Sequence, residues 1–278
     1  NSTYTSSTGA GKIKLPSGTF YFSQGGGSHV SDTTNPNIIK FTKKTGENTA
    51  YVIKAKSYVE IYGKGIDETI LKPSIDYSSY SGGPDFFHYV DYNDGESSFP
   101  TTTDSSGNKN VVYLTNMRYE GFTIDMANVK CGKYNSSGAG FRMPFSKDSI
   151  FNYVKVENSC ATAYGLDYPI NLKINYCYAI NSGKSIEGAT SQGGSGFGIG
   201  TGYRTDESIT ISNSYAINNG KFGFFFEHQA KFGPSWTKNK LTTTAKPAYI
   251  VKNSYASGNM YDFGFFGNHA PWHGLKYS

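Results

Sequence analysis

Short stretches of alternating apolar and polar residues recur along the second half of the chain. Four eight-residue strings align without gaps: VKVENSCA at 154–161, LKINYCYA at 172–179, ITISNSYA at 209–216 and YIVKNSYA at 249–256. Each string alternates over its first half and then passes into small and polar residues, which predicts a strand followed by a turn. The strings start 18, 37 and 40 residues apart, so the longer intervals are expected to carry inserted loops.

A second set of strings follows the first and aligns on a glycine. Its members are YGLDYP at 164–169, SGFGIG at 195–200, FGFFFEH at 222–228 and FGFFGNH at 263–269, aligned on Gly165, Gly196, Gly223 and Gly264. Each unit therefore predicts two short strands, and successive units stack about 4.8 Å apart. One unit cannot bury its apolar side alone, whereas a stack of units forms a continuous core, so the pattern predicts a β-solenoid. The alignment places Val156, Ile174, Ile211 and Val251 in one inward stack and Asn158, Tyr176, Asn213 and Asn253 in a neighbouring column at turns.

The composition supports an all-β protein. The chain has 33 Gly, 23 Tyr and 19 Phe but only 17% charged residues, and aromatic residues favour strands while glycine favours turns. No apolar run approaches the roughly 20 residues of a membrane-spanning helix, and a removed signal peptide is left open. We expect a single domain over residues 1–278, with loop insertions at about 78–110, 184–194 and 231–247; a domain boundary in the first of these loops is the alternative.

Charge and cysteine content narrow the partner. A net charge of +5 fits a polyanion, but the lysines are scattered and no arginine-rich run occurs, so nucleic acid is the weaker polyanion and is not expected as a partner. Cys131, Cys160 and Cys177 are an odd number without CxxC spacing. This pattern predicts three small buried residues in place of a disulfide scaffold or a zinc site.

Three segments carry a resemblance to a known fold. GKIKLPSGTFYF at 11–22, VEIYGKGIDETILKP at 59–73 and MRYEGFTIDMAN at 117–128 resemble core strands of pectin-lyase-like proteins. Within that class, AYGLDYPINLKI at 163–174 resembles the active-site stretch of alginate (mannuronan) C5-epimerases. Tyr164, Gly165 and Asp167 match the family's Tyr-Gly-x-Asp string, whereas Tyr168 and Pro169 stand where the family has Pro-His, and Phe222 replaces a second histidine.

The resemblance implies a right-handed parallel β-helix that is secreted or held at the cell surface. It implies an acidic, uronate-containing polysaccharide as the substrate. No metal ligands or cofactor are assigned, and a calcium requirement is left open. A monomer is expected, because a solenoid can offer its long outer face to a polymer without a second subunit.

Proton abstraction at C5 of a uronate needs a base and a group that neutralises the carboxylate. Tyr164 is the candidate acid or base and Asp167 the carboxylate that orients a partner; the alternative is that Tyr164 is one of many tyrosines stacked in a solenoid. Arg204 and Lys221 are the candidates that pair with sugar carboxylates, and a solvated turn is the alternative for Arg204.

The glycine alignment adds a second candidate group. His228 and His269 each follow their glycine by five residues, with Glu227 and Asn268 beside them. The alignment stacks one imidazole over the other, where they could bind a metal or serve as acid and base. A solvent-facing polar ladder is the alternative.

Two classes of function remain. The kept Tyr-Gly-x-Asp string favours a polysaccharide-modifying enzyme, either a C5-epimerase or a β-eliminating lyase, and the missing histidine favours a non-catalytic carbohydrate-binding or adhesive β-helix. A glycoside hydrolase ranks below both, because the alignment gives Asp167 no second carboxylate in its column. On the enzymatic hypothesis we expect Tyr164, Asp167, Arg204 and His228 to open onto one groove.

Overall fold

In the described part of the chain, every regular element is a strand. The computed structural model describes residues 11–22, 29–31, 39–41, 51–74, 84–90, 100–107, 109–129, 131, 138–184, 194–202, 204, 206–228, 248–267 and 275–277. No helix among these residues is long and apolar enough to cross a membrane.

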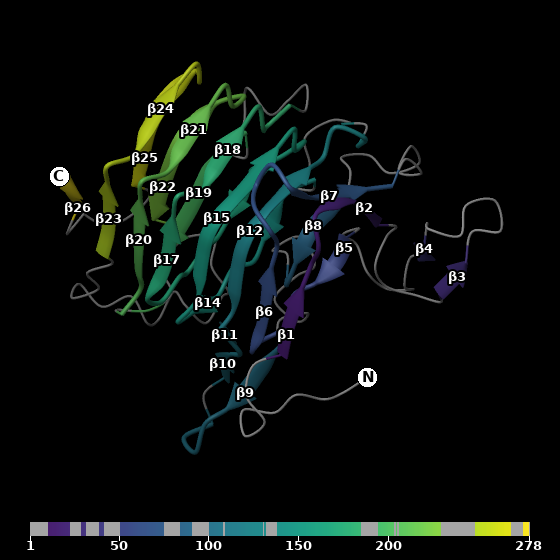
Figure 1. Cartoon of the computed structure of the whole chain (residues 1–278). Helices are drawn as coiled ribbons and strands as arrows, with labels where there is room; N and C mark the ends of the chain where they lie inside the picture. Colours follow the sequence, from purple (N-terminus) through teal and green to yellow (C-terminus); the bar gives the residue numbers. More distant parts are fainter. Residues whose placement is uncertain are drawn as a thin grey trace.

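Successive turns of the chain, here called coils, stack along one axis (Figure 1), with the N-terminal strands at one end and the C-terminal strands at the other. Most coils contribute three strands. The first three coils contain β1 (Gly11–Lys14), β2 (Gly18–Phe22) and β5 (Tyr51–Lys54), then β6 (Val59–Tyr62), β7 (Thr69–Pro73) and β8 (Asp85–His88), then β12 (Arg118–Asp125) and β13 (Phe141–Arg142). The next three contain β15 (Ile150–Glu157) and β16 (Tyr164–Gly165), then β17 (Leu172–Asn175), β18 (Tyr178–Ile180) and β19 (Phe197–Thr201), then β20 (Ser208–Ser212), β21 (Tyr215–Ile217) and β22 (Phe222–His228).

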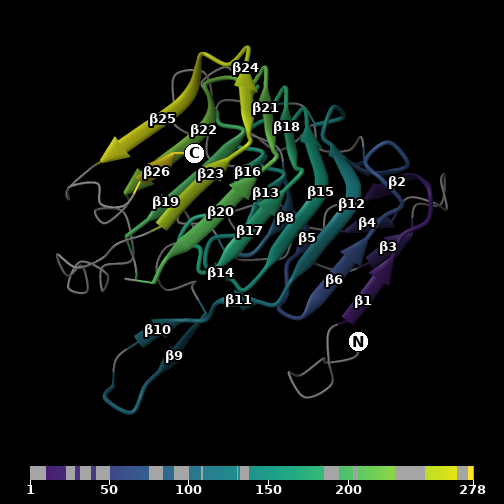
Figure 2. The ribbon, with the colours of Figure 1, turned by 60° about the vertical axis from the view of Figure 1, so that its left-hand side comes forward.

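The C-terminal end and the connections complete the set of strands. The last full coil contains β23 (Ala248–Lys252), β24 (Tyr255–Ser257) and β25 (Tyr261–Gly267), and β26 (Leu275–Tyr277) begins another. Between the main strands lie a parallel pair, β11 (Leu114–Thr115) with β14 (Ser146–Lys147), and two antiparallel hairpins, β3 (His29–Ser31) with β4 (Ile39–Phe41) and β9 (Thr101–Thr103) with β10 (Lys109–Val111). Figure 2 shows the β9–β10 hairpin projecting from the body of the solenoid.

Two sheets enclose the core. A thirteen-stranded sheet bends around a corner, with β1, β6, β17, β20, β23 and β26 on one side, β2, β7, β18, β21 and β24 on the other, and the long strands β12 and β15 running through the bend. A seven-stranded sheet, ordered β25-β22-β19-β16-β13-β8-β5, closes the third side. All neighbours in both sheets pair in parallel, which confirms the β-solenoid predicted from the repeated strings and the parallel β-helix implied by the resemblance.

The inward stack differs from the prediction at one member. Ile174, Ile211 and Val251 do occupy one column of the thirteen-stranded sheet. The prediction for Val156 was wrong, because Phe151 lies opposite Ile174 and Val156 lies opposite Ala179. The coil step here is 23 residues (174 minus 151), not 18, since VKVENSCA belongs to the second half of β15, beyond the corner.

Asparagine columns mark the corner where each coil leaves the thirteen-stranded sheet. Asn158, Asn181 and Asn218 have φ of 63°, 54° and 55°, and Gly258 follows them with 69°. Asparagine tolerates this left-handed conformation better than other non-glycine residues. The amide of Asn181 donates to Asn158 Oδ1 at 2.9 Å, and the amide of Asn158 donates to Asp125 Oδ1 at 2.9 Å. These bonds tie successive coils together at the turn.

The first predicted loop insertion was partly wrong. The segment from 78 to 110 contains β8, a strand of the seven-stranded sheet, and the β9–β10 hairpin. Phe86 and Phe87, which belong to β8, are buried in the core. Apart from Lys184 and Gly194, the insertions at 184–194 and 231–247 lie outside the described residues.

Candidate functional site

The inner face of the seven-stranded sheet carries a continuous aromatic stack. Neighbouring rings lie 4.6 to 5.3 Å apart between centroids and within 20° of parallel, and they belong to Phe87, Phe141, Tyr164, Phe197, Phe224 and Phe263. Because side chains alternate between faces along a strand, the residue after each of these rings points outward. The aromatic stack thus fixes which residues the outer face presents.

Along one column of the outer face, basic residues give way to glycines. In one column Lys54, His88 and Arg142 are followed by Gly165 and Gly198. Gly165 and Gly198 are half-buried, whereas Gly200, two residues further along β19, is buried. A Cβ at Gly165 would meet only the Phe141 carbonyl, at 3.3 Å. We call Gly165 and Gly198 the glycine strip, since neither adds a side chain to the outer face.

A buried ion cluster lies next to the glycine strip. Asp85 Oδ2 accepts from Arg142 Nε at 3.0 Å and lies 3.0 Å from His88 Nδ1, while Asp85 Oδ1 accepts from the Ala139 amide at 2.8 Å. Burial raises the pKa of Asp85, but the Arg142 charge and the bonds from His88 and Ala139 outweigh it, so the pKa is lowered. The carboxylate is therefore ionised and holds the Arg142 guanidinium in place, one strand from Gly165.

Carboxylates lie along the other edge of the glycine strip. Asp167 Oδ1 accepts from the Gly200 amide at 2.5 Å, and Gly200 lies opposite Glu227 on the next strand. Asp167 and Glu227 therefore share one outward column with Gly200 between them. This register corrects the expectation that Asp167 has no carboxylate in its column. Two strand spacings separate their backbones by about 9.6 Å, and both side chains are half-buried.

Tyr164 does not reach this face, so its prediction as a groove residue was wrong. Its side chain is fully buried in the inner aromatic stack, and its hydroxyl donates to Val154 O at 2.8 Å. Burial raises the pKa of Tyr164 well above its ordinary value. The phenol therefore stays protonated and is shielded from a polymer on the outer face. Gly165 and Asp167, the other residues of the matched string, do lie on the outer face.

The histidine pair was also predicted incorrectly. His228 lies opposite Thr201, as the alignment expected, but opposite Gly267 on the following strand. The string 263–269 is therefore displaced by two residues relative to the glycine alignment, and His269 is not the partner of His228. His269 and the side chain of His228 lie outside the described residues.

The two predicted cations lie at opposite ends of their strands, Arg204 after the end of β19 and Lys221 before the start of β22. Arg204 is exposed and forms two hydrogen bonds with Asp206, at 2.7 and 3.0 Å, in the turn after β19. Lys221 precedes β22, and its Nζ lies 5.4 Å from the centroid of the Phe222 ring. Sequence reasoning missed Asp85, His88 and Arg142. The signal for Asp85 and His88 was that they flank Phe86 and Phe87, in a segment that was interpreted as a loop.

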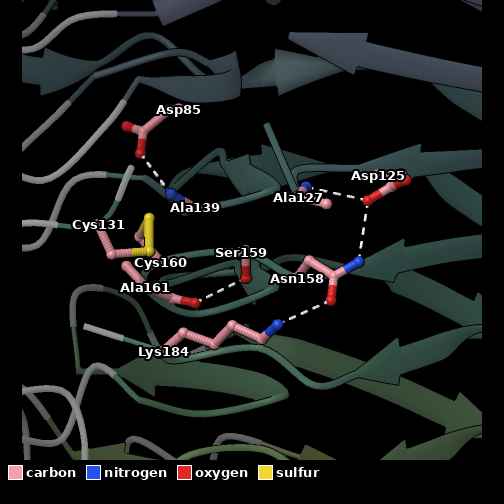
Figure 3. Close-up of a disulfide and its surroundings, with 10 residues drawn as sticks. All are labelled: Asp85, Asp125, Ala127, Cys131, Ala139, Asn158, Ser159, Cys160, Ala161 and Lys184. Carbon is pink, nitrogen blue, oxygen red and sulfur yellow. Dashed lines mark hydrogen bonds between the residues drawn. A yellow bond between two sulfur atoms is a disulfide. The ribbon is translucent and has the colours of Figure 1, made fainter. Parts of the chain in front are cut away.

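A disulfide corrects the cysteine prediction. Cys131 and Cys160 are bonded, with a sequence separation of 29 residues, while Cys177 is free and buried. Figure 3 shows this bond beside the hydrogen-bonded chain from Asp125 through Asn158 to the Lys184 ammonium. The disulfide ties the connection after β12 to the turn after β15, at the corner that leads into the seven-stranded sheet.

No metal cluster marks another site among the residues that the structure describes. No group of three or more His, Cys, Asp and Glu side chains there could hold a metal ion. A cavity of about 270 Å³ lies at the N-terminal end of the core, but its lining is almost wholly apolar, with Ile13, Phe22 and Ile61 among its residues. Such a lining offers little to orient a sugar.

Comparison with known proteins gives a structural likeness only. No protein-family profile matches the chain, and no curated protein matches it. Among solved structures, the chain is similar to the A-module of the mannuronan C-5 epimerase AlgE4 from Azotobacter vinelandii, with 15% identity and a TM-score of 0.45. The match covers 93% of this chain and 59% of the A-module chain, so the chain corresponds to little more than half of that structure.

Proposed function

We propose that this protein binds and modifies an acidic, uronate-containing polysaccharide on the outer face of the seven-stranded sheet. The observation that carries the proposal is the glycine strip, which lies between a fixed guanidinium and a column of carboxylates. Outward glycines let a polymer approach the main chain closely. Arg142, which lies opposite Gly165, and Lys221, which precedes β22, are suited to pair with sugar carboxylates.

The proposed reaction is removal of the C5 proton, as in a C5-epimerase or a β-eliminating lyase. Asp167 and Glu227 are the candidate proton-transfer groups, with His228 as a third candidate because its main chain adjoins Glu227. Tyr164 has no part in it, since its hydroxyl is buried and bonded to Val154. Non-catalytic carbohydrate binding is the second candidate function, and the burial of Tyr164 is the observation that favours it.

The protein is proposed to work outside the cytoplasm. The Cys131–Cys160 disulfide is the supporting observation, because such bonds form and persist mainly in oxidising compartments.

The test incubates the protein with mannuronan, with polygalacturonate and with a neutral β-glucan. Three signals are followed: C5-proton exchange from heavy water, ultraviolet absorbance of an unsaturated uronate, and new reducing ends. Exchange without absorbance identifies an epimerase, and absorbance identifies a lyase. New reducing ends without absorbance would overturn proton abstraction in favour of hydrolysis by the Asp167 and Glu227 pair.

Gly198→Leu provides the site variant, because it places a side chain on the strip while its Cβ meets side-chain atoms and not main chain: Thr162 Cγ2 at 3.1 Å, Thr162 Oγ1 at 3.7 Å and Ser195 Cβ at 3.9 Å. Thr210→Leu adds bulk at an outward position of the thirteen-stranded sheet and is the matched control. We expect Gly198→Leu to weaken retention on the acidic polymers in affinity electrophoresis, and Thr210→Leu to leave it unchanged. Equal retention of both variants would contradict a site on this face.

A further inference from the structure

Two exposed tyrosines occupy the bend of the thirteen-stranded sheet, at the corner that does not border the seven-stranded sheet. Tyr153 follows the first half of β15, and Tyr176 follows β17 one coil later. Their rings are stacked with centroids 4.7 Å apart and an interplanar angle of 4°. They are 45% and 37% exposed, so the pair is not part of the core.

Both tyrosines adopt an unfavourable backbone conformation. Tyr153 and Tyr176 each have φ of 51°, a left-handed value that is a genuine outlier for a bulky residue. The same bend carries Gly121 with φ of 71° in the preceding coil and Asn213 and Asn253 with φ of 51° and 50° in the following ones. Glycine and asparagine adopt this conformation readily. Burial does not explain why two coils use tyrosine instead.

The next position in the column is an asparagine and not a ring. In the coil after Tyr176, the Asn213 amide points back to the preceding coil and donates to Asn175 Oδ1 at 3.0 Å. Asn175 also accepts from the Ser212 hydroxyl at 3.0 Å. The aromatic stack therefore ends at Tyr176, and short amide side chains line the column beyond it. An aromatic face beside amide donors and acceptors suits the apolar ring face and the hydroxyls of a sugar.

We propose that this corner is a second carbohydrate-binding site, in which a pyranose ring of a polysaccharide stacks on Tyr176 over Asn213. The sugar continues the ring stack, and the amides of Asn213 and Asn253 hydrogen-bond its hydroxyls. This site does not depend on the reaction proposed for the seven-stranded sheet, because the two lie on different sides of the solenoid. Neutral and acidic polysaccharides share the ring chemistry on which it relies.

Tyr176→Asn tests the proposal by installing the residue type that the column uses elsewhere. Relief of the left-handed tyrosine offsets the lost ring stack, so Tm is expected to change by no more than a few degrees. Affinity for the glycan is expected to fall about three- to tenfold. Tyr176→Phe keeps the ring and is expected to keep the affinity.

Binding is measured by affinity electrophoresis in hydroxyethyl cellulose and in mannuronan, each in the Gly198→Leu background as well as in the parent. If Tyr176→Asn reduces the retardation of the protein by either polymer, and does so in the Gly198→Leu background as well, the result supports the corner site. The polymer on which retardation is reduced is the one that the site binds. If Tyr176→Asn lowered Tm and left migration in both gels unchanged, the corner site would be overturned and the tyrosine stack would have a structural role only.

Discussion

Replacing Tyr164 by phenylalanine separates a structural tyrosine from a catalytic one. The hydroxyl of Tyr164 donates to Val154 O at 2.8 Å and lies 3.4 Å from Tyr178 O. Its ring stacks between those of Phe141 and Phe197, at 5.3 and 4.6 Å. Tyr164→Phe removes only the hydroxyl, so the stack persists and one buried hydrogen bond is lost. We expect polysaccharide binding and any C5-proton exchange to stay within twofold of the parent.

The cost in stability follows from that one bond. A buried hydrogen bond contributes about 0.5–1.5 kcal/mol net, and about 1 kcal/mol corresponds to a Tm shift of about 2 °C for a chain of this size. Tyr164→Ala is the matched variant, because it also removes the ring and is expected to cost about 3–5 kcal/mol. Thermal unfolding followed by circular dichroism measures both.

The activity assay decides the interpretation. A proton-transfer group contributes about 10² to 10⁴ in rate, a loss that exchange from heavy water detects easily. If Tyr164→Phe lost exchange on that scale while its Tm stayed within 2 °C of the parent, the phenol would have to act on substrate, and its placement in the inner stack would be wrong. Intact exchange in Tyr164→Phe together with loss in Asp167→Asn is the expected pattern.

Three further perturbations test the fold and its ion cluster. Cys160→Ser opens a 29-residue separation and is expected to destabilise the fold by about 3–4 kcal/mol, seen as a lower guanidinium midpoint that the parent reproduces under dithiothreitol. Stability is expected to fall above about pH 9, because burial raises the pKa of the Cys177 thiol from 9.0 to about 12; the stabilisation is full below the unfolded value and is lost as pH rises through the folded one. Cys177→Ala should flatten that fall in midpoints measured at pH 7, 9 and 11. Arg142→Ala leaves the buried Asp85 carboxylate without its cation and is expected to cost about 3–5 kcal/mol. Because the lowered pKa of Asp85 gives stability that is lost as pH falls, acid unfolding of Arg142→Ala should begin at a higher pH than in the parent.

The fold could be predicted from sequence because the repeated strings record it directly. Ile174, Ile211 and Val251 recur in equivalent positions, and each is the inward residue of its coil. The register of the earlier coils could not be predicted in the same way. β15 runs through the corner without interruption. VKVENSCA therefore looks like a strand that precedes the corner, although Val156 lies in the half of β15 beyond it.

The candidate site was harder to predict, because its residues come from coils whose strings do not repeat. Gly165 was aligned with Gly196, but it lies opposite Gly198, and a shift of two residues keeps the same face while changing every partner. The same shift hid the shared column of Asp167 and Glu227. Arg142 and Asp85 are 57 residues apart, and only stacking of β8 on β13 brings them together.

Abundant tyrosine makes the type of residue alone a poor guide to function in this chain, and exposure has to be considered with backbone conformation. Every feature of Tyr164 has a structural explanation: its burial, its place in the ring stack and its bonded hydroxyl all stabilise the fold. Tyr176 is exposed and adopts a conformation that costs energy where asparagine would not. The resemblance that pointed to Tyr164 and the strain that points to Tyr176 therefore make opposite predictions for two single substitutions. Tyr164→Phe should affect stability and spare the sugar, and Tyr176→Asn should spare stability and affect the sugar.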